Sequence, residues 1–194
     1  MLGAGAILLA ALLGSIPFGL LLTRAAGLGD VRSIGSGNIG ATNVLRTGNK
    51  KLAAATLLLD ALKGAAAVWL AGWIAGPGWE PAAAVAAVLG HCHPPWLGFQ
   101  GGKGMATALG VMLGLAWPIF LIAALTWLVA ARLSRRSSVG AMAAIAVAPA
   151  AALVFATPGA ALGLLILGVH VIWRHKENIQ RLLAGTEPRI GEGR

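Results

Sequence analysis

Six long apolar runs, separated by short polar stretches, constrain this chain more than any other feature of its sequence. The first run, residues 2–23, is long enough to cross ~30 Å of hydrocarbon, because about 20 helical residues span a bilayer. The others cover residues 52–74, 81–99, 105–133, 139–156 and 159–173. Only 11% of the residues are charged, against about a quarter in soluble domains. We therefore expect an integral membrane protein built from helices.

The distribution of Lys and Arg predicts the topology. These residues cluster after the first, third, fourth and last runs, whereas residues 72–80, 116–118 and 156–159 carry none. By the positive-inside rule, the clusters are cytoplasmic. For Lys103 and Arg132 to share that side, the run between them must cross twice. The turn is expected at Trp117-Pro118, since proline cannot donate to a continuing helix. The expected fold is an all-α polytopic transmembrane helix bundle of about seven spans, with the N-terminus out and the C-terminus in.

Residues 1–194 are expected to form a single integral membrane domain. Its polar motif loops, residues 24–51, 90–104, 132–138 and 174–194, all fall on the cytoplasmic face of this topology. The formal net charge of +9 is accounted for by topology and by attraction to anionic lipid. It requires no nucleic-acid partner.

The first motif loop reads GSGNIGATNVLR over residues 35–46. Glycine can take positive φ and lets the backbone approach a ligand, while the amide, hydroxyl and guanidinium side chains supply donors. A loop of this kind that leads into a helix suits an oxyanion. The alternative is a flexible connector between spans. The candidate residues are Gly35, Ser36, Gly37, Asn38, Thr42, Asn43 and Arg46.

The second motif loop contains Gly101-Gly102-Lys103-Gly104, directly before a helix that is expected to begin near Met105. Three glycines free the backbone, and the lysine supplies a point charge beside the positive end of that helix. The spacing does not match GxxxxGK[ST], so nucleotide binding is not indicated.

Two further stretches carry candidate ligands. In residues 132–138, Ser137 or Ser138 could bind phosphate beside three arginines or could cap the following helix. In the segment after Trp173, a helix is expected to end at Gly185. His175 and Asn178 within it are spaced i,i+3 and share one face.

Three other groups of polar or reactive residues have simple structural interpretations. Asp60 and Lys63, spaced i,i+3 inside the second run, are expected to pair and to face the bundle interior, because ionisable groups in hydrocarbon are costly. His91 and His93 lack a Cys or carboxylate at supporting spacing, so a metal site is disfavoured. Cys92, the single cysteine, is expected to be a small buried apolar residue.

The segments GSGNIGATNVLR, LLLDALKG, GGKGMATALG and HKENIQRLLAGTEPRI resemble the signature segments of PlsY-type bacterial glycerol-3-phosphate acyltransferases, which use acyl phosphate as the donor. The resemblance runs from residue 14 almost to the C-terminus. It implies acyl transfer from acyl phosphate to the 1-hydroxyl of sn-glycerol 3-phosphate, giving 1-acyl-sn-glycerol 3-phosphate (lysophosphatidic acid) and phosphate, the first step of phospholipid synthesis.

The resemblance also implies roles for residues. Arg46, Lys103, His175 and Asn178 would hold glycerol phosphate, while Ser36 and glycine backbone would hold the acyl-phosphate head. Ser138 matches the serine that follows the fifth span, with Ser137 as the less favoured choice. The implied catalytic residues are Ser36, Lys103 and His175; the implied substrate-binding residues are Gly35, Gly37, Asn38, Thr42, Asn43, Arg46, Gly101, Gly102, Gly104, Ser138 and Asn178.

The implied partners are glycerol 3-phosphate, fatty acyl phosphate and membrane lipid, with no metal, cofactor, nucleic acid or obligate protein partner. The implied location is the bacterial inner membrane, with the active site facing the cytoplasm. The proton acceptor stays open between His175 and a substrate phosphate oxygen. The competing class is a multi-span anion or phosphate transporter, although transporters usually show paired repeats with sites near the bilayer midplane.

Overall fold

The computed structural model describes residues 1–191, and within that range the regular elements are helical, with no strand. The α-helices are α1 (Leu2–Gly14), α2 (Phe18–Ala25), α3 (Ala41–Val44), α4 (Lys50–Ala75), α5 (Glu80–Cys92), α6 (Met105–Leu115), α7 (Trp117–Ser134), α8 (Ser137–Phe155), α9 (Pro158–Arg174) and α10 (Lys176–Leu183). Short 3-10 turns cover η1 (Val31–Ser33), η2 (Leu45–Thr47), η3 (Pro77–Trp79) and η4 (Pro95–Leu97). The all-α prediction is confirmed for these residues.

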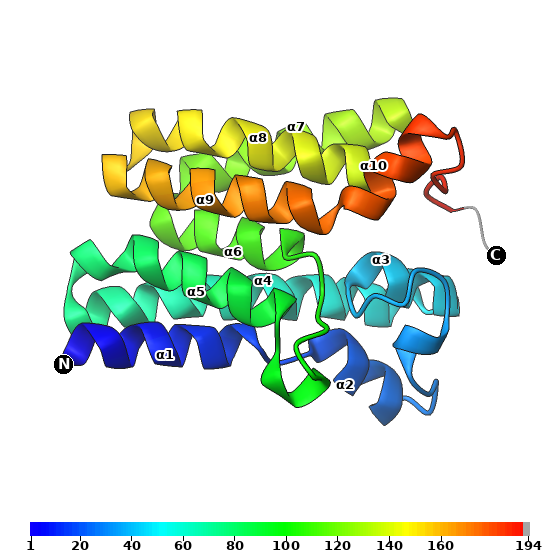
Figure 1. Ribbon diagram of the computed structural model, residues 1–194, viewed down its shortest axis with the longest axis horizontal. Helices are drawn as coiled ribbons and strands as arrows, with labels where there is room; N and C mark the ends of the chain where they lie inside the picture. Colours follow the sequence, from blue (N-terminus) through cyan, green and yellow to red (C-terminus); the bar gives the residue numbers. More distant parts are fainter. Residues whose placement is uncertain (192–194) are drawn as a thin grey trace.

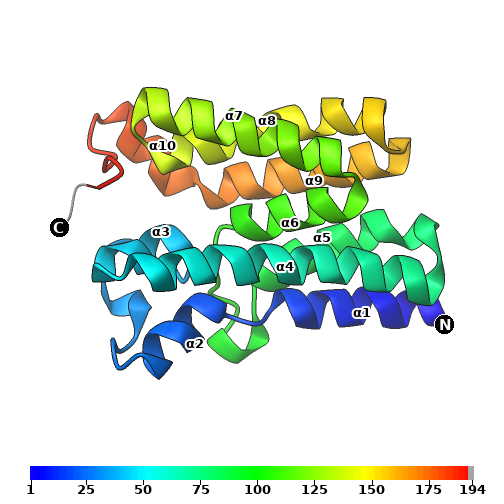
Figure 2. The ribbon, with the colours of Figure 1, turned by 180° about the vertical axis from the view of Figure 1, so that it is seen from behind.

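The long helices lie nearly parallel to one axis and alternate in direction (Figure 1). α1, α4 and α5 form one side of the bundle, α7, α8 and α9 form the other, and α6 lies between them, as the reverse view also shows (Figure 2). Short turns join the helices at the end that holds the N-terminus. The long polar loops gather at the opposite end, together with α3 and α10 (Figure 1). This arrangement brings the four motif loops to one end of the molecule.

The fourth apolar run is divided where the proline predicted a turn. α6 ends at Leu115, Ala116 is extended, and α7 begins at Trp117 with Pro118 in its first turn. The two helices are unequal, with 11 residues in α6 and 18 in α7. At 1.5 Å per residue, α6 is about 16 Å long, well short of the hydrocarbon thickness.

Among residues 1–191, four helical stretches are long and apolar enough to cross a membrane: Leu2–Ala25, Lys50–Ala75, Trp117–Ser134 and Ser137–Phe155. A fifth candidate is the pair α9 and α10, which bends by 56°. The count of seven spans and the orientation of the termini stay predictions.

Small residues allow the helices of the bundle to pack closely. A Cβ on Gly110 of α6 would collide with the backbone of Ala61 in α4, and a Cβ on Gly14 would collide with the backbone of Ala87 in α5. Close approach through small residues is the usual way in which membrane helices pack. The first contact fixes α6 against α4, and the second fixes α1 against α5.

The expected Asp60–Lys63 pair is present and buried. Lys63 Nζ lies 2.6 Å from Asp60 Oδ1 and 3.0 Å from His91 Nδ1 on α5. It also donates at 2.7 Å to the carbonyl oxygen of Ile16, which lies in the non-helical link between α1 and α2. Cys92 is buried, as expected. Lys63 of α4 therefore connects this helix to α5 and to the link between α1 and α2.

Candidate active site

The first motif loop is organised around the side chain of Asn43. Its amide group donates to three backbone carbonyls, those of Val31 at 2.8 Å, Ile34 at 3.1 Å and Asn38 at 2.8 Å. Its Oδ1 accepts from the backbone N–H of Ser36 at 3.1 Å and from the Arg46 guanidinium at 3.3 Å. Asn43 is only 2% exposed, so it shapes the loop from within.

Around Asn43, the other predicted residues of this loop come together. Gly35 and Gly37 have φ of 54° and 66°, the left-handed conformation that the sequence predicted for glycine there. A Cβ on Gly35 would collide with the Arg46 and Asn43 side chains. Ser36 is exposed and Arg46 half-buried. We call this group the loop cluster: Gly35, Ser36, Gly37, Asn38, Asn43 and Arg46.

The second motif loop does not present its first two glycine amides to solvent. Gly101 N–H donates to the Cys92 carbonyl and Gly102 N–H to the His91 carbonyl, both at 3.0 Å. A Cβ on Gly101 would collide with the carbonyl of His91, and one on Gly102 with the His91 ring. These glycines are therefore required for close packing against α5. The unpaired amides at the start of α6, after Gly104 (φ 88°), are the ones left for an anion.

Lys103, which follows these glycines, points to the C-terminal segment. Its Nζ donates to Asn178 Oδ1, and the amide of Asn178 donates to Glu187 Oε1 at 2.6 Å. The same carboxylate accepts from Ser138 Oγ at 2.6 Å and from Arg181 Nε at 2.7 Å. We call this group the tail cluster: Lys103, Ser138, Asn178, Arg181 and Glu187.

The tail cluster is electrostatically unusual. Burial, followed by the nearby Arg181 charge, lowers the pKa of Lys103 to about 8. Burial alone would raise the pKa of Glu187, but the hydrogen bonds from Ser138, Asn178 and Arg181 outweigh it and lower that pKa. Glu187 is thus ionised at neutral pH, and Lys103 can gain or lose a proton near physiological pH.

His175 lies at the junction of α9 and α10, next to this cluster. It is 4% exposed, and its Nδ1 lies 2.7 Å from the Val171 carbonyl oxygen. Since a carbonyl only accepts, Nδ1 carries the proton and Nε2 keeps a free lone pair. Burial lowers the pKa of His175 to about 4, and the Lys103 charge acts in the same direction. His175 is therefore neutral at pH 7.

The two serines after α7 have different positions. Ser138 is 6% exposed and belongs to the tail cluster, whereas Ser137 Oγ lies 3.3 Å from Thr42 Oγ1 of the first motif loop. Of the two alternatives for these serines, capping of α8 is wrong: the N-cap is Arg136, with no side-chain capping bond. Ser134 accepts from the Arg136 amide instead, because the reversal after α7 is tight.

Glu187 and Arg181 were not among the predicted site residues. Glu187 is 7% exposed, although it lies in a segment without helical structure. The chain has only six acidic residues, so a glutamate beside a cationic motif was a usable signal. The helix of this segment was predicted from the sequence, whereas the contacts of this carboxylate were not.

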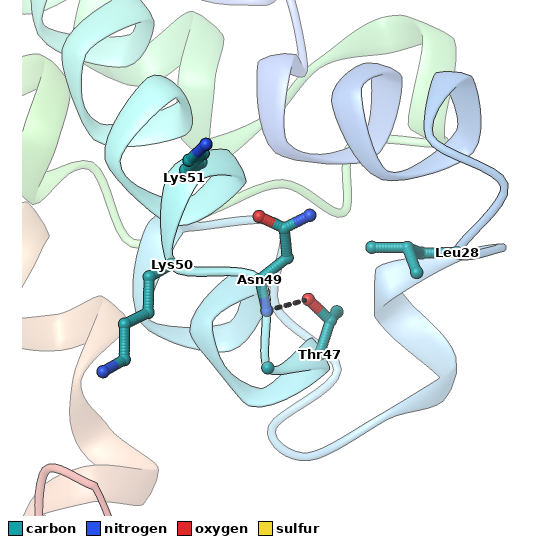
Figure 3. Close-up of a pocket in the computed structure, with 6 residues that line it drawn as sticks. Leu28, Thr47, Asn49, Lys50 and Lys51 are labelled. Atoms are coloured by element: carbon teal, nitrogen blue, oxygen red, sulfur yellow. Dashed lines mark hydrogen bonds between the residues drawn. The ribbon is translucent and has the colours of Figure 1, made fainter.

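A separate open hollow lies at the start of α4, lined by Leu28, Thr47, Gly48, Asn49, Lys50 and Lys51 (Figure 3). Lys50 and Lys51 extend from the helix in different directions there, and Asn49 N–H donates to Thr47 Oγ1 at 3.3 Å. None of its lining residues belongs to the loop cluster or the tail cluster.

The family model "Glycerol-3-phosphate acyltransferase" matches residues 4–185 of the chain. A glycerol-3-phosphate acyltransferase from Mesorhizobium japonicum is 61% identical over 180 residues, covering 93% of this chain and 92% of that protein. One from Paramagnetospirillum magneticum is 59% identical over 180 residues, covering 93% and 90%.

Two solved crystal structures are similar over almost the whole chain. Both are of PlsY, an integral membrane glycerol 3-phosphate acyltransferase. The glycerol 3-phosphate form has a TM-score of 0.91 and 37% identity, covering 97% of this chain and 96% of that one. The lysophosphatidic acid form has a TM-score of 0.90 and 36% identity, covering 97% and 95%.

Proposed function

The chain belongs to the glycerol-3-phosphate acyltransferase family, with the integral membrane fold of PlsY, and from that premise we propose the reaction it performs. It transfers a fatty acyl group from acyl phosphate to the 1-hydroxyl of sn-glycerol 3-phosphate. The products are 1-acyl-sn-glycerol 3-phosphate and inorganic phosphate. The chain would act in the bacterial inner membrane, with its site on the cytoplasmic face.

The observation that carries this proposal is the convergence of Lys103, Asn178 and His175 at one end of the bundle. An ammonium group, an amide and a neutral imidazole with a free lone pair can bind a phosphate and receive a proton in the same place. The loop cluster, with Arg46 and Ser36, lies at the same end (Figure 1). Two cationic side chains together with glycine-rich backbone suit a reaction in which both substrates carry phosphate.

In this proposal, glycerol 3-phosphate is bound by residues of both clusters, and the acyl-phosphate head is bound by the loop cluster. Arg46, Lys103, His175 and Asn178 hold glycerol 3-phosphate, and Ser36 with the glycine-rich backbone holds the acyl-phosphate head. Asn43, Gly101 and Gly102 act indirectly, because their polar groups are already engaged within the protein. Ser138 likewise acts through Glu187, which holds Asn178 in place.

In the reaction itself, the hydroxyl oxygen of glycerol phosphate attacks the acyl carbonyl carbon, and the carbon–oxygen bond to phosphate breaks. Phosphate leaves with the bonding electron pair. An acyl phosphate is already activated, so no covalent enzyme intermediate is required. Holding the two substrates together supplies much of the acceleration, and Lys103 with the free amides at the start of α6 offsets the developing negative charge.

The hydroxyl proton goes to His175 Nε2 or to a substrate phosphate oxygen. The free lone pair of His175 favours the first acceptor, while its pKa of about 4 makes it a weak base until an anion binds beside it. Near-normal turnover in His175→Gln, with weakened substrate binding in His175→Ala, would favour the phosphate oxygen. Loss of turnover in both variants would favour the imidazole.

The direct test follows phosphate release from purified protein in lipidic cubic phase with acyl phosphate and glycerol 3-phosphate. Release should depend on both substrates, should need no added metal, and should not occur when acyl-CoA replaces the donor. Release without glycerol 3-phosphate would indicate a phosphatase. Uptake of phosphate into proteoliposomes without turnover would favour the transporter alternative.

A further inference from the structure

Arg174, the last residue of α9, contacts the second motif loop through its guanidinium. Nη2 donates to the Gly101 and Gly102 carbonyl oxygens, both at 3.0 Å, and Nε donates to that of Gly102 at 3.2 Å. Arg174 was not among the predicted site residues. In the fold it lies against backbone that is 72 residues away in sequence.

The same two glycines are held from the other side by α5. Their N–H groups donate to the His91 and Cys92 carbonyls, and the His91 ring leaves no room for a Cβ at Gly102. His91 is fixed in turn by Lys63 at 3.0 Å. Each of the two glycines is thus held at both of its backbone polar groups, by α5 at the N–H and by Arg174 at the carbonyl oxygen.

Lys103 is the next residue after this double attachment. Its ammonium reaches Asn178, so its backbone has to stay in one place for its side chain to meet the tail cluster. Arg174 is also directly followed by His175. One guanidinium therefore ties together the backbone that carries the ammonium group and the residue before the imidazole.

We propose that Arg174 is a positioning residue, which fastens the Gly101–Gly102 backbone to the end of α9 and so sets Lys103 and His175 at a fixed separation. Its guanidinium donates to backbone carbonyls, so it acts through the loop and not on substrate. This inference rests on the proposed function for its kinetic consequences, but not for its structural ones.

The planar shape of the Arg174 guanidinium matters as much as its charge. A guanidinium can bridge two carbonyls at once, whereas an ammonium group is a single point and cannot reproduce the fork. Arg174→Lys should therefore behave like Arg174→Gln, although it keeps the charge. A shift of about 1 Å in a catalytic group can cost about 100-fold in rate, so we expect kcat to fall by about that factor in both variants.

The test compares Arg174→Gln, Arg174→Lys and Arg174→Ala with Lys176→Gln, which removes an exposed cation two residues away. The control should stay within about twofold of the wild type, since a solvated charge contributes little. The loss in the Arg174 variants should fall mainly on kcat, with little change in KM. Methylguanidine at millimolar concentration should restore part of the activity of Arg174→Ala.

Hydrogen exchange provides a readout that does not depend on activity. The peptide that contains Gly101 and Gly102 should exchange at least tenfold faster in Arg174→Gln, because bound amides exchange only when the loop opens. Peptides from α5 and α6 should be unchanged. Faster exchange across all three would overturn the proposal, since Arg174 would then stabilise the whole bundle.

Activity within about threefold of the wild type in Arg174→Gln, or unchanged exchange of the glycine peptide, would also overturn it. If the wild type itself shows no acyl transfer, the proposed function fails, and the exchange measurement still decides whether Arg174 holds the loop.

Discussion

The loop cluster and the tail cluster lie at the same end of the molecule but are built in different ways. In the loop cluster, one amide side chain makes all of its contacts within 12 residues of its own position. In the tail cluster, one carboxylate joins segments 49 residues apart, and Lys103 reaches a partner 75 residues away. The first site is organised locally, whereas the second depends on the packing of α6, α8 and α10.

This difference gives the two clusters different sensitivities. A locally organised loop can keep its shape when the helices of the bundle shift. A cluster that joins distant segments changes its geometry whenever the packing of those helices changes. Substitutions in the loop cluster should therefore impair activity without affecting the rest of the fold. Substitutions in the tail cluster should affect both activity and the stability of the C-terminal half.

The largest effect is expected from Lys103→Ala. Removing a group that offsets charge on the reacting atoms costs about 10²- to 10³-fold in kcat. Lys50→Ala, which removes an exposed cation from the same end of the bundle, is the matched control and should stay within about twofold. Phosphate-release kinetics measure both. Equal losses in the two variants would mean that only the net charge of this end matters.

Asn43→Ala is the sharpest test of local organisation. It removes one donor from each of three carbonyls, although the Ile34 carbonyl keeps the Gly37 N–H. It also frees Ser36 and Arg46, so kcat/KM should fall by about 100-fold. The melting temperature should change little, and faster hydrogen exchange should be confined to residues 31–48. Faster exchange in α8 or α10 would show that the two clusters are not independent.

Glu187→Gln tests the long-range cluster. The side-chain oxygen of a glutamine can still accept from Ser138 and Asn178. Its NH₂ group would face the Arg181 N–H, however, and because both groups are donors no hydrogen bond can form there. An unsatisfied buried group costs about 2 kcal/mol, which corresponds to roughly 30-fold in activity and roughly 4–8 °C in melting temperature. Thermal unfolding in detergent gives the second value. A loss of activity with no change in melting temperature would contradict the comparison.

The pH dependence belongs to the tail cluster. Lys103 has a pKa of about 8, so it is charged below that pH and loses its charge above it. The value of kcat/KM should therefore fall about tenfold per pH unit above 8. Since a guanidinium stays charged, Lys103→Arg should lose this alkaline limb even if its rate is lower. An unchanged limb in that variant would assign the titration to another group.

The smallest effect is expected from Thr42→Val. The hydroxyls of Thr42 and Ser137, 3.3 Å apart, form an exposed contact between the first motif loop and α8. An exposed hydrogen bond contributes about 0.5–1.5 kcal/mol at most, so activity should fall by no more than about two- to tenfold. Ser137→Ala should give the same value. A larger loss in Thr42→Val than in Ser137→Ala would mean that Thr42 binds substrate directly, as the family resemblance implies.

The sequence predicted what depends on local chemistry. The turn at Trp117-Pro118, the positive φ of Gly35 and Gly37, and the buried Asp60–Lys63 pair follow from proline, glycine and the cost of buried charge. It did not predict that Gly101 and Gly102 pack on α5 or that Glu187 is buried. Those contacts depend on how helices distant in sequence are arranged, which no local pattern encodes.

The position of Glu187 has a consequence for how the protein is made. Lys103, Ser138 and Asn178 all leave the ribosome before the carboxylate that orders them. Chains are synthesised from the N-terminus at about 5–20 residues per second, so the loop cluster can form well before the tail cluster. A nascent chain that already contains every membrane-spanning helix would still lack a finished phosphate site. The tail cluster can therefore be completed only after residue 187 has been synthesised.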